Sequence, residues 1–370
     1  MHDAPLNIPN RPNPKNSELE NPHRHQFASD NYAGVCPEVW AALAAANCGH
    51  APGYGDDAWT ARASDLLREI FETDCEVFFV FNGTAANSLA LSSLCRSYHS
   101  ILCHQTAHVE TDECGAPEFF SNGTKVLLLP GENGKIEPQS IERMVKRRGD
   151  IHYPKPRVVS ITQSTELGTV YSKVEIENIG KISKAHGLHL HMDGARFSNA
   201  VASLKVAPRS ITWEAGVDVL CFGATKNGAP VGEAVVFFNR ELAAEFDYRC
   251  KQAGQLASKM RFLTASWIGL LEDGAWLRHA SHANTMAALM EAKLRELGVE
   301  ILFPRQSNAV FAQLPVEIVE KMHARGWKFY TFIGEGGCRL MCSWDTAPED
   351  VKAFALDLKT ELERLTAAAR

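Results

Sequence analysis

Seven short apolar runs, separated by segments with helical spacing, are the feature that most restricts the fold of this chain. Continuous apolar runs of this length are typical of strands that are covered on both faces. Their alternation with helices predicts an α/β domain with a mainly parallel, mixed sheet flanked by helices. The runs are CEVFFVF (75–81), SILCH (100–104), TKVLLLP (124–130), RVVSITQ (157–163), LHLHM (188–192), VDVLCFG (217–223) and AVVFF (234–238).

The pattern changes after residue 260. A long helical stretch, SHANTMAALMEAKLRELG, is followed by the short apolar runs VEILF, NAVFAQL and CRLMCSW and by a helix expected from Pro348 onward. We therefore expect a large domain at 27–260 and a smaller α+β domain at 261–370. Residues 1–26 are rich in proline, asparagine and charge, and they predict a flexible tail.

Composition excludes several classes of function. A net charge of −6 over 370 residues gives no electrostatic reason to expect a nucleic acid or an anionic membrane as partner. No apolar run approaches the roughly 18–20 residues that span a bilayer, and the N-terminus lacks a secretory apolar region. The ten cysteines contain no CxxC spacing, so free thiols, a cytoplasmic protein and no bound metal are expected.

Three motifs follow strand-like runs, where ligands of open α/β sheets bind. In NGTAAN (82–87), Gly83 and Thr84 come directly before a helix, whose free N–H groups are suited to a phosphate. In HMDGARF (191–197), Asp193 ends a strand, and in CFGATKNGAP (221–230), Lys226 lies between two apolar runs. Each motif alone has an ordinary explanation. NGTAAN is explained by a capped turn, Asp193 by a helix cap or an ion pair, and Lys226 by a solvated lysine.

Together the three motifs describe a site for a ligand with a phosphate, a ring nitrogen and an aldehyde. Pyridoxal 5′-phosphate has all three groups. In this interpretation Gly83 and Thr84 bind the phosphate, and Asp193 keeps the ring nitrogen protonated, which makes the ring an electron sink. A lysine in apolar surroundings loses proton affinity, so Lys226 would hold the aldehyde as a Schiff base.

At these motifs the sequence resembles the low-specificity L-threonine aldolases, pyridoxal-phosphate enzymes of the aspartate aminotransferase fold (fold type I). The resemblance extends from about Phe27 to the C-terminus. It is carried by FASDNYAG, GYGDD, FNGTAAN, AHVETDECGAPEF, DIHYPKPR, HLHMDGARFSNA and FGATKNGAPVGE. The chain departs from many relatives at AGQLASKMR, which replaces a tighter glycine run, and at QSTELGTVY (163–171), where other branches carry an asparagine-rich version.

The resemblance implies further site residues. His108 would stack on the pyridine ring, with Glu113 near the site on the same segment. Arg196 would contact the ring hydroxyl and the substrate side. The remaining implied contacts are Ser29 and Arg339 with the substrate carboxylate, His152 near the β-hydroxyl, and Lys251 and Arg261 with the phosphate of their own subunit or of its partner.

The reaction implied is reversible retro-aldol cleavage of L-threonine or L-allo-threonine to glycine and acetaldehyde. The substrate amine would displace Lys226, and Arg339 and Ser29 would turn the Cα–Cβ bond perpendicular to the ring. His108, His152 or a water held by one of them would remove the β-hydroxyl proton. The protonated ring would stabilise the glycine carbanion as a quinonoid, and Lys226 would return to release glycine.

Four alternatives remain open at this stage. One is an aldolase for aromatic substrates such as L-phenylserine, and a second is an aminotransferase or β-eliminating lyase on the same fold. A third is a non-catalytic sensor or scaffold, which the intact lysine, aspartate and threonine disfavour. A nucleotide-binding protein is disfavoured because no glycine-rich dinucleotide loop is present. The fold resemblance also implies a homodimer or homotetramer with active sites at the dimer interface.

Overall fold

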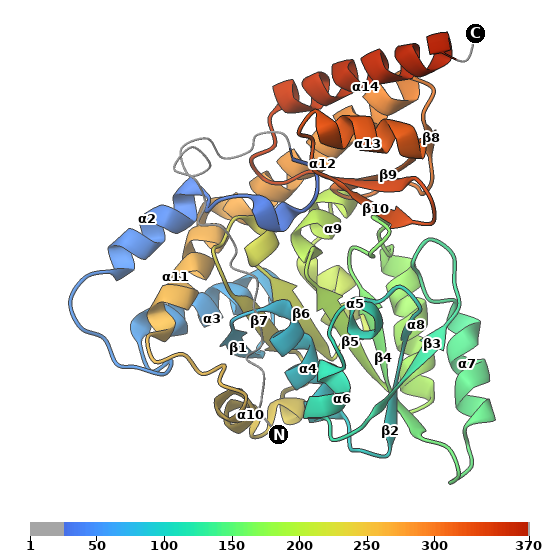
Figure 1. Cartoon of the computed structure of the whole chain (residues 1–370). Coiled ribbons are helices and arrows are strands. Elements are labelled where there is room, and N and C mark those ends of the chain that lie inside the picture. The colour runs from blue at the N-terminus through green and yellow to red at the C-terminus, as the bar shows by residue number, and fades with distance from the viewer. Residues whose placement is uncertain (1–25, 369–370) are drawn as a thin grey trace, which may run out of the picture.

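The computed structural model describes residues 26–368, so the predicted tail lies outside the described residues except for Gln26 (Figure 1). A seven-stranded sheet forms the larger part of the molecule, and each of the seven predicted runs contributes one strand to it. The strands are β1 (Glu76–Val80), β2 (His99–His104), β3 (Lys125–Leu129), β4 (Lys155–Thr162), β5 (His189–Gly194), β6 (Val219–Gly223) and β7 (Glu233–Phe237).

The strand order is β1-β7-β6-β5-β4-β2-β3. Strands β6, β5, β4, β2 and β3 pair in parallel, and β7 is antiparallel to both of its neighbours. The sheet is therefore mixed and mainly parallel, as predicted. Because β7 runs the other way, its first residue, Glu233, pairs with Gly223 at the carboxyl end of β6.

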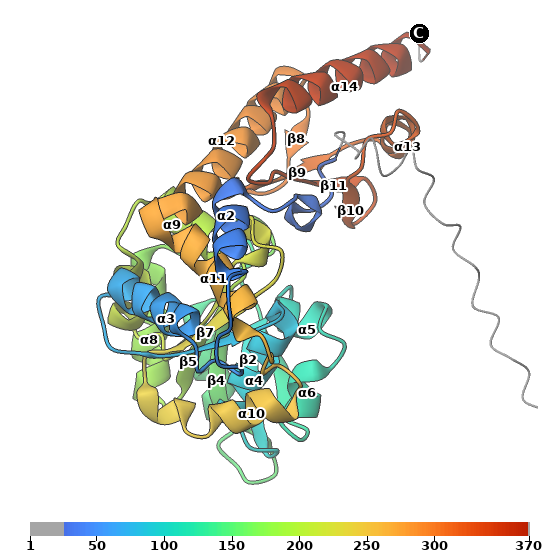
Figure 2. The same cartoon turned by 90° about the vertical axis from the view of Figure 1, so that its left-hand side faces the viewer.

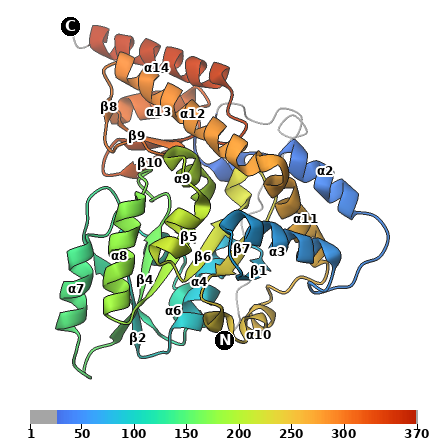
Figure 3. The ribbon, with the colours of Figure 1, turned by 180° about the vertical axis from the view of Figure 1, so that it is seen from behind.

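Alternate residues of each strand enter different apolar clusters, as the period of two in a strand requires. Leu220 and Phe222 of β6 belong to the larger cluster, together with residues of α3, α8, α9 and α11. Val219 and Cys221 belong to a second cluster that includes one side of α4. Both faces of the sheet are thus covered by helices, which Figures 1 and 3 show from opposite sides.

The helices of this larger part begin with α2 (Pro37–Ala46), which packs against α11. The others are α3 (Ala58–Phe71), α4 (Gly83–Leu94), α5 (His108–Thr111), α6 (Ala116–Phe120), α7 (Pro138–Arg147), α8 (Lys173–Ala185), α9 (Phe197–Leu204), α10 (Phe246–Gln252) and α11 (Met260–Leu271).

A four-stranded antiparallel sheet of order β10-β11-β9-β8 forms the smaller part. Its strands are β8 (Glu300–Ile301), β9 (Ala309–Gln313), β10 (Tyr330–Ile333) and β11 (Gly337–Met341). Strand β10 was not expected from the sequence, since it is an edge strand whose side chains are mostly exposed. The helices here are α12 (Ala275–Glu296), α13 (Val316–Ala324) and α14 (Pro348–Ala368).

The two sheets share their surrounding segments. Phe27 packs in the apolar cluster of the smaller sheet, and its carbonyl accepts a hydrogen bond from the Met341 N–H at 2.8 Å. Leu263 and Trp276 pack in the cluster of the larger sheet, so its core includes residues beyond 260. Helix α12 extends from one part of the molecule to the other (Figure 2). Within 26–368, none of the helices has the length and apolar character needed to cross a bilayer.

Candidate active site

The predicted aspartate and lysine lie at the carboxyl edge of the seven-stranded sheet. Thr162 at the end of β4 pairs with Asp193 near the end of β5, and Asp193 pairs with Cys221 of β6. Lys226 follows β6 directly, in the 3₁₀ turn η4 (Thr225–Asn227). Neighbouring parallel strands therefore bring two motifs, 33 residues apart in the sequence, to one place.

Two hydrogen bonds fix the Asp193 carboxylate. The Asn87 side-chain amide donates to Oδ2 at 2.9 Å, and the Ala195 backbone N–H donates to Oδ1 at 2.9 Å. Gly194 lets β5 lie this close to β6, since a Cβ there would be 2.8 Å from the Cys221 carbonyl oxygen and 2.6 Å from Leu220 Cδ1. The glycine of the DGAR motif is therefore required by packing.

A chain of hydrogen bonds links Asp193 to His108. Asn87 Nδ2 also donates to Glu113 Oε1 at 2.8 Å, and the same oxygen lies 2.9 Å from His108 Nδ1. The hydrogen bond to Glu113 raises the pKa of His108 above its ordinary value, although burial opposes this. Burial raises the pKa of Glu113. The Asn87 amide that holds Asp193 thus also holds Glu113, the carboxyl group that binds the imidazole predicted to stack on the cofactor.

Glu166 lies beside this chain. Its Oε1 accepts hydrogen bonds from the His108 backbone N–H and from Thr162 Oγ1, both at 2.8 Å. Burial, with the charge of Asp193, raises the pKa of Glu166 to about 7. Its side chain therefore ties the start of α5, which carries His108, to the end of β4.

The Lys226 amine lies among charges of both signs. Burial lowers its pKa, and the charge of Arg196 lowers it further, while Asp30, Asp193 and Glu233 act in the opposite direction. The result is an amine that loses its proton more readily than a solvated lysine, as a nucleophile toward a carbonyl requires.

Arg196 and Arg339 form the cationic side of the site. Arg196 binds Asp30 through two hydrogen bonds of 2.7 and 2.9 Å, and Asn308 donates to the same carboxylate at 3.1 Å. Burial alone would raise the pKa of Asp30, but the Arg196 guanidinium holds it below its usual value. Burial and the nearby charge of Arg196 lower the pKa of Arg339.

Arg339 is held without a carboxylate partner in the part of the chain that the structure describes. Its Nη2 donates to the Ala28 carbonyl at 3.1 Å, and its guanidinium lies 5.0 Å from the ring centre of Phe332 and 5.8 Å from that of Tyr330. Ser29, the next predicted substrate contact, accepts a hydrogen bond from the Asn31 N–H at 3.1 Å. A guanidinium that is held by a carbonyl and two aromatic rings, without a carboxylate partner, is suited to bind the carboxylate of a ligand.

The predicted phosphate turn begins helix α4. Gly83 is the first helical residue, and the Asn82 side chain caps the helix by accepting from the Ala85 N–H at 2.9 Å. The N–H groups of Gly83 and Thr84 precede the first intrahelical bonds, so they remain for a ligand. A Cβ at Gly83 would meet no atom within 4 Å, so space is open beside this turn.

Three predicted site residues are not brought to this cluster. Lys251 lies over the Tyr54 ring, 4.5 Å from its centre, and Arg261 donates to the Gly49 carbonyl at 3.4 Å. His152 pairs with Asp150 before the start of β4, at the amino edge of the sheet, and 82% of its side chain is exposed. In these positions the three lie on or near the outside of the single chain.

Sequence reasoning missed several residues of the cluster, and it missed one for an identifiable reason. Only nine residues, 224–232, join the end of β6 to the start of β7, which is short for the crossover that a parallel pair needs and indicates an antiparallel return. That return places Glu233 beside Lys226. The other missed residues, whose partners are distant in sequence, are Asp30, Asn87, Glu166 and Asn308.

The cluster fits pyridoxal phosphate. It offers free N–H groups for a phosphate, a carboxylate for a ring nitrogen and an amine for a carbonyl. It also concentrates buried polar atoms that have no hydrogen-bond partner among residues 26–368, which is typical of a ligand site. These atoms are Asn87 Oδ1, Glu113 Oε2, Glu166 Oε2, Asn308 Oδ1 and Arg339 Nε.

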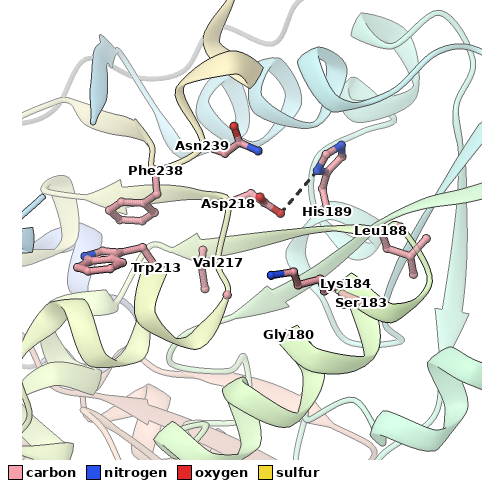
Figure 4. A pocket seen from close by; sticks show the side chains of 12 residues that line it. Gly180, Ser183, Lys184, Leu188, His189, Trp213, Val217, Asp218, Phe238 and Asn239 are labelled. Atoms are coloured by element: carbon pink, nitrogen blue, oxygen red, sulfur yellow. Dashed lines mark ion pairs between the residues drawn. The ribbon is translucent and has the colours of Figure 1, made fainter. Parts of the chain in front are cut away.

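A cavity of about 510 Å³ lies at the opposite edge of the sheet, between α8 and the starts of β5 and β6 (Figure 4). Its lining includes Lys184, His189, Trp213 and Asp218, and His189 Nδ1 lies 3.6 Å from Asp218 Oδ2. Ligands of open α/β sheets bind at the carboxyl ends of the strands. This amino-edge cavity is therefore separate from the cofactor site.

Three potential metal ligands also meet outside the cluster. Donor atoms of Cys36, Glu38 and His279 all lie within 4.8 Å of one another, a juxtaposition with no signature in the sequence spacing. Glu38 is already bound there by His279 at 3.0 Å and by Arg278 at 3.2 Å. The group is thus satisfied by its own ion pairs, and we assign it no metal.

Comparison with known proteins shows the family of the chain. The β-eliminating lyase family model matches residues 26–316. The low-specificity L-threonine aldolase of Pseudomonas aeruginosa is 64% identical over 91% of this chain and 98% of that protein, and the one of Pseudomonas sp. (strain NCIMB 10558) is 64% identical over 90% and 97%. The solved Leishmania major threonine aldolase is 31% identical, with a TM-score of 0.86 over 91% of this chain and 99% of that one. The chain belongs to the low-specificity L-threonine aldolases, within the β-eliminating lyase family.

Proposed function

We propose that this chain cleaves L-threonine and L-allo-threonine to glycine and acetaldehyde, and joins the two products in the reverse direction. The observation that carries the proposal is the position of Lys226 and Asp193 on adjacent strand ends, in one cluster with Arg196. The names of the relatives, which are 64% identical, agree with a carbon–carbon lyase of this specificity.

Pyridoxal phosphate, when bound, supplies the carbonyl that joins the Lys226 amine and the conjugated ring that accepts the electron pair of the breaking Cα–Cβ bond. Asp193 would hold a proton at the ring nitrogen, and Gly83 and Thr84 would bind the phosphate. Asn87 and Ala195 keep the Asp193 carboxylate in place through two hydrogen bonds of 2.9 Å.

Arg339 would bind the substrate carboxylate, with Ser29 beside it and Arg196 close by. The Ala28 carbonyl and the ring of Phe332 limit the directions that the Arg339 guanidinium can take. A carboxylate bound there fixes rotation about the bond between the substrate nitrogen and Cα. That restriction is what selects the Cα–Cβ bond for cleavage.

His108 is the base that we propose for the β-hydroxyl proton. Its Nδ1 is engaged by Glu113, which orients the ring and leaves Nε2 as the proton acceptor, with the Asp112 carboxylate 3.5 Å away. The same hydrogen bond raises the pKa of His108, which strengthens it as a base. His108 must be neutral to act, so activity should fall as the pH drops through this raised pKa.

His152, Lys251 and Arg261 would act on the site of a second copy of the chain, since none of them is brought to the cluster of its own chain. Exposed aromatic side chains on the same part of the molecule support such an interface: Trp40 of α2 is 66% exposed, Tyr54 is 51% exposed and Tyr248 of α10 is 73% exposed. We propose that the chain forms a homodimer or homotetramer whose subunits share active sites. We also propose that the enzyme acts in the cytoplasm.

A second candidate is cleavage of L-phenylserine, because the rings of Phe332 and Tyr330 flank Arg339 and could border an aromatic substrate. The test is release of glycine and aldehyde from L-threonine, L-allo-threonine and L-threo-phenylserine by purified protein with added pyridoxal phosphate. Comparable cleavage of the two threonines is expected. Cleavage of phenylserine alone would transfer the proposal to aromatic substrates, and glycine from none of the three would overturn it.

A further inference from the structure

Glu233 is tied to both residues that precede Lys226. Its Oε2 accepts a hydrogen bond from the Ala224 N–H at 3.1 Å, and its Oε1 accepts one from Thr225 Oγ1 at 2.8 Å. Its cross-strand partner is a glycine, Gly223, at which a Cβ would lie 2.9 Å from Glu233 Oε2. The side chain is 7% exposed, so the fold holds an acidic group inside the lysine turn.

The other acids that face Lys226 are already engaged. Asp30 accepts two hydrogen bonds from Arg196, and Asp193 accepts from Asn87 and Ala195 and is the proposed partner of the ring nitrogen. Glu233, like Asp193, accepts hydrogen bonds from neutral donors, which leave its charge uncompensated, but unlike Asp193 it is bound to the lysine turn itself and has no proposed partner on the cofactor. It is therefore the carboxyl that remains to balance the Lys226 ammonium.

We propose that Glu233 is the positioning residue of Lys226: its carboxyl fixes the backbone that leads into the lysine and supplies the negative charge that faces the ammonium. The proposal rests on Lys226 being the residue that joins the cofactor. When the Lys226 amine condenses with an aldehyde, a C=N bond forms, water leaves, and the nitrogen must then carry a proton to be reactive. Burial and Arg196 both oppose that proton, and Asp30, Asp193 and Glu233 counteract them.

The charge of Glu233 changes in the working pH range. Burial raises its pKa to about 7, while the hydrogen bond from Thr225 and the charge of Lys226 lower it and Asp193 raises it. The Cys221 thiol on β6 also faces it. Glu233 is therefore ionised above about neutral pH, and its effect on Lys226 should be strongest there.

The test is the pH dependence of Lys226 acetylation by acetic anhydride in cofactor-free protein, followed on the Lys226 peptide by mass spectrometry. Only the neutral amine reacts, so the midpoint reports proton loss from Lys226. In Glu233→Gln the midpoint should move down by roughly one pH unit, the size of shift typical of losing one close opposite charge. An unchanged midpoint in folded Glu233→Gln overturns the proposal.

Two variants separate charge from structure. Glu166→Gln removes a carboxyl with a similarly raised pKa that binds His108 and Thr162 instead of the lysine turn, so the Lys226 midpoint should stay in place. Thr225→Val removes one hydrogen bond to Glu233 but keeps the Glu233 charge. If the Lys226 acetylation midpoint fell as far in this variant as in Glu233→Gln, the role of Glu233 would be structural only.

If Glu233→Gln does not fold, Glu233→Asp serves instead, because its shorter side chain withdraws the carboxylate from Lys226. The acetylation midpoint should then show a smaller downward shift, and no shift would overturn the proposal.

A second measurement distinguishes this proposal from the proposed function. Pyridoxal phosphate should protect Lys226 from acetylation, and the pH-dependent absorbance of the loaded protein should shift in Glu233→Gln in the same direction as the labelling midpoint. Absence of protection in the wild type would contradict the role of Lys226 itself. Protection without any shift in Glu233→Gln would leave that role intact and overturn only the role of Glu233.

Discussion

The two sheets of the molecule contribute to the site in different ways. The seven-stranded sheet provides Asp193, Glu233 and Lys226 at or just beyond strand ends. The buried Glu233 carboxylate binds the turn that carries Lys226. The four-stranded sheet provides Arg339 from β11, together with the segment at Ala28 that its hydrogen bonds hold in place.

This difference assigns separate tasks to the two parts. Groups on rigid strand ends are suited to holding a cofactor and to changing its protonation, because their positions are fixed by the sheet. The smaller sheet offers the Arg339 guanidinium, which is suited to recognising a substrate carboxylate, and the N-terminal segment offers the Ala28 carbonyl that holds this guanidinium. The contacts that join the two parts include the Arg196–Asp30 ion pair and the hydrogen bond from Arg339 to the Ala28 carbonyl. Substitutions in the two parts should therefore affect different kinetic constants.

The largest effect is expected from Lys226→Ala, which should abolish turnover and the borohydride-reducible adduct with pyridoxal phosphate, because Lys226 is the lysine that the described part of the chain places in the cluster. Adduct stoichiometry by mass spectrometry checks this. Lys184→Ala, at the amino-edge cavity, is the matched control and should form the adduct normally. A full adduct in Lys226→Ala would show that another lysine is used.

Asp193→Ala should come next, with kcat falling by about 100-fold or more, the scale of losing one strong electrostatic contact in an active site. The folded protein should persist, since the change removes a charge whose partners are an amide and a backbone N–H. Steady-state kinetics measures the loss of kcat, and circular dichroism checks that the variant is folded. Asp218→Asn at the opposite edge of the sheet should stay within a few-fold of wild type. Activity near wild type in Asp193→Ala would refute the electron-sink role.

Arg339→Gln should separate the two parts of the molecule most clearly. We expect KM to rise by roughly 100-fold, in line with a charged hydrogen bond of about 1.5–3 kcal/mol, with a smaller change in kcat. Pyridoxal phosphate affinity should be unchanged. Arg305→Gln, which breaks an ion pair with Glu291 in the smaller part, is the control. Equal losses of cofactor and substrate binding in Arg339→Gln would contradict the division of tasks.

The smallest effect is expected on stability, from Glu166→Gln. Its folded pKa of about 7 lies above the unfolded value of about 4.3, so the native state binds the extra proton and stability falls as pH rises from about 4.3 to about 7. Glutamine keeps the acceptor for His108 and Thr162 without the charge. Glu166→Gln should therefore unfold at a higher temperature than wild type at pH 8, and no higher at pH 4. A lower midpoint at pH 8 would mean that the charged bond to His108 outweighs burial.

Much of the fold could be predicted because it depends on local patterns. All seven strands of the large sheet were predicted from apolar runs, since a strand covered on both faces must be apolar throughout. Strand β10 was not, because an exposed edge strand needs no such run. Gly83, Asp193 and Lys226 were found as motifs that follow strands, but their roles beyond position remain proposals.

Partners distant in the sequence could not be predicted. Asp30 binds Arg196 from 166 residues away and Asn308 from 278 residues away, and Asn87 reaches Asp193 across 106 residues. Hydrogen bonds and charge–charge energies depend on distances of a few ångströms in space, which no local pattern specifies. Glu233 shows this in one residue, since it became a neighbour of Lys226 through the reversed direction of β7.

The sequence by itself determined the α/β class, the strand positions and the chemical groups available at the strand ends, because periodicity and residue type act locally. The tertiary structure decided which of those groups meet. Strand order and direction bring Asp193, Lys226 and Glu233 to one edge, and burial there shifts the pKa values of Lys226 and Glu233 away from those of solvated side chains. His152 precedes β4, whose carboxyl end is Thr162. The full length of that strand therefore leaves His152 at the amino edge of its own sheet, away from the site.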